Sequence, residues 1–250
     1  MLNYIRSELY RSTHTRPCYV MTAVLVLGIL AFNLVLHFWG SGADYYGHTS
    51  FSYVFSISKP WLYMVCGAVV AALLYEGRSK NGNLKNSLAS GLSRSQLFVG
   101  QCLTALLIAT IMMVIVVAVW AASAELLLAH TDFWTLGDFL CSVAAAYPLA
   151  VASLVSIIPF FLLFRRDLTA VAGWLMVWNV APALFAGLGL KFSWASRLAS
   201  WMPKNFLSFD SVICWWEKPM ILEKALISAL IGILVFGLLG VVSWRKRDLN

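Results

Sequence analysis

The sequence predicts an all-α integral membrane protein with six transmembrane helices and both termini in the cytoplasm. Hydrophobic residues make up 61% of the chain and charged residues only 12%, about half of the charged share of a soluble domain. Six windows contain no Asp, Glu, Lys or Arg: 17–42, 60–75, 97–124, 139–164, 168–190 and 225–244. Five of them reach the ~20 residues that cross a bilayer, and Lys59 shortens the second window. We therefore expect one transmembrane domain over residues 1–250.

The basic residues set the predicted orientation. With the N-terminus inside, most of the 18 Lys and Arg residues fall in cytoplasmic segments, whereas acidic residues favour the opposite side. The net charge of +7 thus reflects topology and attraction to anionic membrane lipid. Because the charges are dispersed among the ends of the spans, they do not indicate nucleic-acid binding. We expect the chain in the cell (plasma) membrane.

The longest cytoplasmic stretch between spans is a polar segment, residues 76–96. Within it, Leu84, Leu88 and Leu92 recur every four residues, which places them on one stripe of a short helix. Such an amphipathic helix, fixed between spans 2 and 3, is suited to bind another protein. The alternative is a solvated loop whose Lys and Arg only set topology.

Cap signals mark the end of this segment. Gly91 is the residue type that closes a helix, and Ser93 followed by Gln96 is a capping box that begins the next helix. The sequence therefore predicts that span 3 begins directly after the polar segment.

The first 16 residues place Leu2, Ile5 and Leu9 on one side of a helix. Basic residues in the same stretch, such as Arg6 and Arg11, are available for lipid phosphates. This pattern favours an interfacial helix along the inner leaflet over a frayed tail.

Span 5 carries Trp174, Met176, Trp178 and Asn179. An aromatic and thioether face with one amide suits an adaptable cavity for an apolar substrate, and packing between helices is the alternative.

Two stretches are predicted outside. Residues 39–58 form a polar and aromatic loop, and residues 191–224 are the longer external segment. In the latter, Trp194, Leu198 and Trp201 recur at helical spacing, which predicts a helix on the outer leaflet that Pro203 stops.

The sequence offers little for catalysis. The spans hold no Asp, Glu or His pair at helical spacing and no HExxH, so we expect no catalytic residues and no metal site. No carboxylate lies well within a span, which disfavours an ion-coupled transporter. No G-x-x-x-x-G-K-[ST] motif occurs either, so energy for transport would come from a separate subunit.

Three motifs resemble the type-2 ABC exporter permease family. In that family the loop between spans 2 and 3 starts with a glutamate and runs through a lysine-bearing short helix to a Ser-Arg pair. Here these are Glu76, the stretch 82–88 and the stretch 91–94. The C-terminal stretch 246–249 is also similar to how many members end. The resemblance covers the whole chain.

The resemblance implies that residues 83–89 are a coupling helix held in a cleft of a separate cytosolic ABC ATPase, with the N-terminal helix beside it. The implied interface residues are Glu76, Asn83, Leu84, Lys85, Leu88, Ser93 and Arg94. This chain would bind no cofactor, since ATP and Mg²⁺ belong to the ATPase. A second permease chain, identical or a paralogue, would complete the exporter.

The resemblance further implies that spans 2 and 5 line the substrate path. The candidate path residues are Trp61, Met64, Trp174, Trp178 and Asn179. The implied function is ATP-driven export of an amphipathic or hydrophobic substrate, a peptide. The alternative is a membrane immunity or binding protein that sequesters a peptide without transport.

Overall fold

The computed structural model describes residues 2–14, 16–40, 46–57, 64–72, 91, 93–164, 167–206 and 219–246. Within these residues all regular structure is helical, apart from one isolated β-bridge between His48 and Ala129. The all-α prediction is therefore confirmed for the described part of the chain.

Five of the described helices are long and apolar enough to cross a membrane. They are Cys18–Trp39, Arg94–Leu127, Leu136–Phe161, Leu168–Leu188 and Leu222–Ser243. Each coincides with one of the predicted windows. In the remaining window, 60–75, residues 64–72 are helical and the rest lie outside the described residues.

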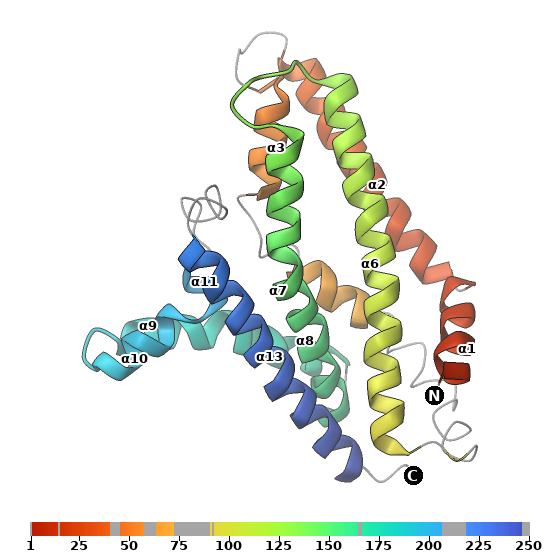
Figure 1. Ribbon diagram of the computed structural model, residues 1–250, viewed down its shortest axis with the longest axis vertical. Helices are drawn as coiled ribbons and strands as arrows, with labels where there is room; N and C mark the ends of the chain where they lie inside the picture. The colour runs from red at the N-terminus through yellow and green to blue at the C-terminus, as the bar shows by residue number, and fades with distance from the viewer. Residues whose placement is uncertain are drawn as a thin grey trace.

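The helices form a bundle around α7 (Leu136–Leu163). In its most apolar window 67% of the residues are buried, against 11% to 22% in the other four spanning helices. The helix α13 (Pro219–Lys246) packs along α7, and α2 (Arg16–Trp39) packs on α6 (Arg94–Leu127) (Figure 1). The helix α7 is continuous through Pro148 and Pro159, and Thr135 and Asp138 form a capping box at its start.

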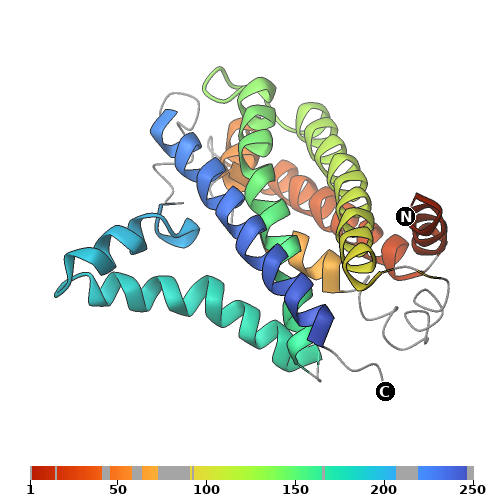
Figure 2. The same ribbon diagram turned by 60° about the horizontal axis from the view of Figure 1, so that its bottom comes forward.

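Span 5 leaves this bundle. It consists of α8 (Asp167–Leu175), the π-helical turn η2 (Met176–Val180) and α9 (Ala181–Leu188). Figures 1 and 2 show it diverging from α7 as it runs away from residue 167, and α10 (Ser193–Ser200) then turns back along α9. The short α11 (Pro203–Phe206) follows, so the helix predicted in this segment is present and ends before Pro203.

Two clusters of apolar side chains fill the bundle. The first surrounds the start of α6 and includes Leu97, Phe98 and Trp174. The second lies toward the other end of α6 and includes Tyr53 and Phe139, whose rings stack with centroids 4.8 Å apart.

The 64–72 helix lies against α7 at very short range. An added Cβ on Gly67 would lie 2.9 Å from the backbone oxygen of Ala150, so only glycine allows this approach. One turn further along α7, the Ser153 hydroxyl donates a hydrogen bond to the Met64 carbonyl. Span 2 is thus joined to α7 by a close backbone approach and by a buried hydrogen bond.

Part of the predicted outer loop is a buried helix, α3 (Thr49–Ile57). It is held by Asn33 of α2, which donates to Ser123 Oγ at 2.7 Å and accepts from Ser52 Oγ at 2.7 Å. Trp120 Nε1 also donates to Ser52 Oγ, at 2.9 Å. These partners satisfy an amide that is fully buried, which explains how α3 packs against the spans although its sequence looked loop-like.

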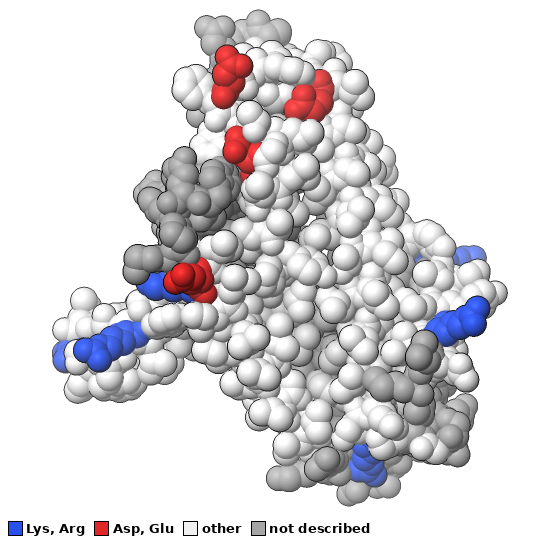
Figure 3. All heavy atoms as spheres, viewed as in Figure 1, with Lys and Arg blue, Asp and Glu red and all other residues white. Residues whose placement is uncertain are grey.

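Most of the acidic side chains on this face lie at one end of the molecule. Figure 3 shows them where α6 ends and α7 begins, with a further acidic side chain beside basic ones at the base of the arm formed by α9 and α10, whereas other Lys and Arg lie around α1 and the start of α6. Basic side chains also mark the arm formed by α9 and α10. The acidic end includes Glu125, which accepts from Tyr53 Oη at 2.9 Å. Burial and this hydrogen bond to Glu125 raise the pKa of Tyr53, so its hydroxyl stays a donor.

We predict that Gly67→Ala destabilises the fold by about 1–3 kcal/mol, because the new methyl group meets a backbone carbonyl that cannot rotate away. The measurement is the thermal unfolding midpoint of the detergent-solubilised chain. Gly237→Ala on α13 is the matched control, since its Cβ would meet nothing within 4 Å. Equal midpoints for the two variants would contradict the close approach of span 2 to α7.

Candidate functional site

The start of α6 has the geometry that the sequence predicted. Ser93 Oγ accepts from the Gln96 backbone N–H at 3.2 Å, and Gln96 Oε1 accepts from the Ser93 N–H at 3.1 Å. Gly91 has a φ of +88°, the left-handed conformation of a residue that ends a helix. The capping box is therefore confirmed, and Arg94 is the first residue of α6.

The other residues of the predicted ATPase interface lie outside the described residues. They are Glu76, Asn83, Leu84, Lys85 and Leu88. Trp61 of the predicted substrate path lies there too. For all six, the roles stay predictions.

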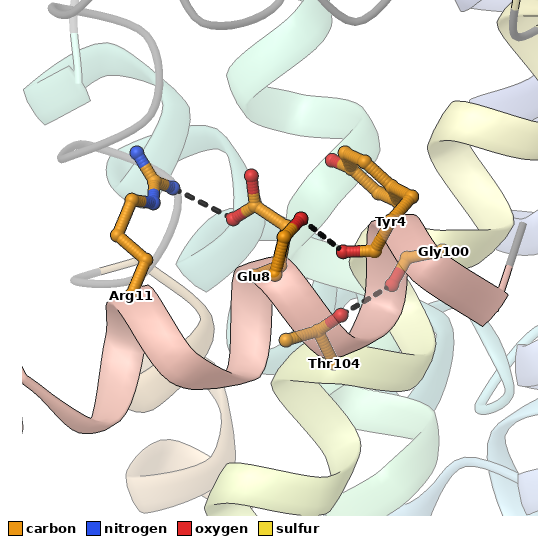
Figure 4. A network of polar contacts seen from close by, with 6 residues as sticks. Tyr4, Glu8, Arg11, Gly100 and Thr104 are labelled. Atoms are coloured by element: carbon orange, nitrogen blue, oxygen red, sulfur yellow. Dashed lines mark hydrogen bonds and ion pairs between the residues drawn. The ribbon is translucent and has the colours of Figure 1, made fainter.

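The N-terminal helix α1 (Leu2–Thr13) packs directly on the start of α6. Figure 4 shows Tyr4 beside Gly100, and an added Cβ on Gly100 would lie 2.9 Å from the Tyr4 ring. Tyr4, Glu8 and Ser12 form the buried stripe of α1. A helix was expected here, and the structure adds that its buried face presents polar groups as well as Ile5 and Leu9.

The basic residues of α1 differ in their surroundings. Arg11 donates to Glu8 Oε2 at 2.7 Å, so its guanidinium neutralises a carboxylate that is 7% exposed. Arg6 is exposed and is the better candidate for a lipid phosphate. The sequence analysis missed this docked face: Tyr4, Glu8 and Ser12 have the i, i+4, i+8 spacing of one helix face, but two of the three residues are polar.

Two cavities lie on different sides of α7. The first has a volume of about 260 Å³ and lies between α2, the 64–72 helix, α6 and α7. Its wall includes Cys66, Gly67 and Val70 of span 2, and a hydrogen-bonded pair, Thr110 Oγ1 and Tyr147 Oη at 2.9 Å. Met64, a predicted path residue, is not on this wall: it is buried in the second cluster.

One serine of α7 binds both tryptophans of span 5. Ser156 Oγ accepts from Trp174 Nε1 at 2.8 Å and from Trp178 Nε1 at 3.0 Å. Trp174 is 2% exposed and packs between helices in the first cluster. Trp178 is half-buried, stacks on Phe236 and lines the second cavity. The sequence singled out both tryptophans but not the serine between them.

Asn179 lies in the π-helical turn of span 5. Its side-chain Nδ2 donates to the Leu175 carbonyl at 3.2 Å, and its own carbonyl accepts from Lys204 Nζ at 2.9 Å. Pro182, which has no N–H and crowds the preceding turn, explains why the helix widens here. A lysine of α11 thus ties α11 to the irregular turn of span 5.

The second cavity has a volume of about 540 Å³ and lies between span 5, α10 and α13. Its wall includes Trp178 and Pro182 of span 5, Trp201 after α10, and Phe236 of α13. Of the predicted path residues, Trp178 alone lines a described cavity. The structure therefore brings Trp174 and Trp178 together at Ser156, and Trp178 also packs against the second cluster, which contains Met64.

Within the described parts of the chain, no three His, Cys, Asp or Glu side chains lie close enough to hold a metal ion. Both cavities are lined mainly by aliphatic, aromatic and thioether groups, which suit apolar ligands.

Compared with known proteins, the chain matches no family model and no curated sequence. The family resemblance therefore rests on the motifs in residues 76–96 and at the C-terminal end of the sequence.

We predict that Ser156→Ala destabilises the fold by about 1–3 kcal/mol, because it leaves two indole N–H groups without an acceptor in an apolar setting. Ser142→Ala is the matched control: Ser142 is also buried on α7, but it bonds only the Asp138 carbonyl of its own helix. Thermal unfolding and tryptophan fluorescence in detergent are the measurements. If both variants behave alike, Ser156 does not hold span 5.

Proposed function

We propose that this chain is the transmembrane permease subunit of an ABC exporter in the cell membrane. A separate cytosolic ATPase hydrolyses ATP with Mg²⁺, and the permease moves an amphipathic or hydrophobic substrate, a peptide, across the membrane. One observation carries this proposal. The polar segment 76–96 ends at a capping box from which α6 runs for 34 residues, about 51 Å at the rise of an α-helix.

A rigid helix that begins at the edge of a docking segment is a means of moving the membrane domain. The segment connects span 2 to α6. A partner bound to Leu84 and Leu88 therefore acts on both helices. The helix α1 packs on the same end of α6 through Tyr4 and Gly100, and it adds contact area there.

Movement of span 2 has a physical route to the far side of the bundle. The 64–72 helix contacts α7 through Gly67 and Ser153. Ser156, one turn along α7, holds Trp174 and Trp178 of span 5. We propose that the ATPase acts on the Trp178 cavity through this series of contacts.

Span 5 also supports the proposal of a second permease chain. In its most apolar window, only 11% of the residues are buried within one chain. The rest of its surface is available to membrane lipid or to the second permease chain, whether identical or a paralogue. The substrate path then lies between the two chains, beside Trp178.

We predict that the double variant Leu84→Asp, Leu88→Asp loses co-purification with its ATPase, because two charges replace the apolar stripe that enters the ATPase cleft. The measurement is the protein that accompanies the tagged permease in mild detergent, assayed for ATP hydrolysis.

The double variant Asn86→Asp, Ser87→Asp is the matched control, since it adds the same charge to the same segment off the stripe. An ATPase retained equally by both variants contradicts the proposed docking. A wild-type chain that binds peptide but never co-purifies with an ATPase favours the alternative, a membrane protein that sequesters a peptide without transport.

A further inference from the structure

The second cavity is a groove with a polar end and an apolar end. We call it the α10 groove; its wall consists of Val177, Trp178, Pro182, Arg197, Leu198, Trp201, Met202, Pro203, Ser228, Ile231, Gly232, Val235 and Phe236. Among the residues of this wall, Arg197 is the only ionisable one. At the other end of the groove, Phe236 and Trp178 stack on one another.

Two lysines lie near the polar end, and one carboxylate, Glu223, lies beside Lys224 on α13. Lys224 lies one turn before Ser228 on α13, and its Nζ lies 5.9 Å from the centre of the Trp201 ring. Lys204, on α11, donates to the Asn179 carbonyl close to the wall residue Pro182. A ligand that fits this groove therefore carries a negative charge at one end and an apolar body behind it.

The dimensions of the groove match one leaflet of a bilayer. From Ser228 to Phe236 it follows α13 for about 12 Å at the rise of an α-helix. Half of the ~30 Å hydrocarbon core is ~15 Å. The volume of about 540 Å³ lies within the range of small-molecule sites.

The surrounding helix α10 has the character of an interfacial helix. Its Ala195 and Ala199 are buried, whereas Trp194 is 55% and Leu198 48% exposed. A helix that packs on its small residues and presents Trp and Leu outward sits at the boundary between head groups and acyl chains. The polar end of the groove thus lies at head-group depth.

We propose that the α10 groove binds one anionic phospholipid of the surrounding bilayer. Arg197 binds the phosphate, Lys224 adds attraction to the negative head group, and an acyl chain lies along α13 from Ser228 to Phe236. The groove is the cavity on which the ATPase is proposed to act, but lipid binding there needs no ATPase and is tested without one, so its failure and the failure of the proposed function are distinguishable.

The test is native mass spectrometry of the full chain released from mixed vesicles of equal phosphatidylglycerol and phosphatidylcholine. Wild-type protein is expected to retain phosphatidylglycerol preferentially. Arg197→Gln is expected to reduce that retention about tenfold, the effect of losing one charge-assisted hydrogen bond. Lys191→Gln is the matched control, because Lys191 is exposed on the same arm but does not line the groove.

A second pair of variants tests the apolar part. Val235→Trp fills the groove and is expected to abolish retention, whereas Leu234→Trp is not: Leu234 is similarly exposed on α13 but lies off the wall. Equal retention of both lipids by wild-type protein overturns the proposal, as does retention by Arg197→Gln and Val235→Trp at control levels. A Val235→Trp variant that loses dimers but keeps its lipid shows that a second copy, not a lipid, occupies the groove.

Discussion

The architecture depends on two serines one turn apart on α7. Ser153 donates to the Met64 carbonyl of span 2, and Ser156 accepts from two indoles of span 5. Both serines are fully buried, so no water replaces these bonds. The most buried helix of the bundle is therefore the element through which spans 2 and 5 are held relative to one another. Residues of both spans, Val70 and Trp174 among them, also pack in the first cluster, so α7 and this cluster together relate one span to the other.

This constraint gives the proposed function a mechanical basis. The polar segment joins span 2 to α6, and the capping box at Ser93 makes α6 begin at a fixed residue. A force on the segment is then applied to two helices. One of them contacts α7 at Gly67, where an added Cβ would lie only 2.9 Å from the Ala150 oxygen, so the two backbones leave no room to slide freely. Trp178, which binds Ser156 of α7, also lines the wall of the second cavity. The contacts from span 2 through α7 to span 5 therefore end at a cavity large enough for a ligand.

Much of this could be predicted from the sequence because it depends on local patterns. Charge-free windows locate the spans, and the Ser93–Gln96 spacing specifies a cap, since both partners lie within one turn. Contacts between distant segments leave no such signal. In the sequence, Ser156 is one of several small residues of an apolar helix, and nothing marks its two indole partners. Ser52 lies in a polar stretch that the sequence predicts as a loop, whereas the structure shows it bound to Asn33 and Trp120. The docked face of α1 was missed for a related reason: Glu8 is buried there, where a sequence pattern expects an apolar residue.

The central claim is that the polar segment faces the cytosol, where a separate motor protein can hold it. The most direct measurement replaces Lys85 by cysteine in a chain whose five native cysteines have been exchanged for alanine. Intact cells are then treated with a maleimide that does not cross membranes, and Asp132→Cys, exposed just beyond the far end of α6, serves as the outward-facing control. The account predicts that the cysteine at 85 is labelled only after the membrane is opened, whereas the cysteine at 132 is labelled in intact cells. Labelling at position 85 in intact cells would contradict it.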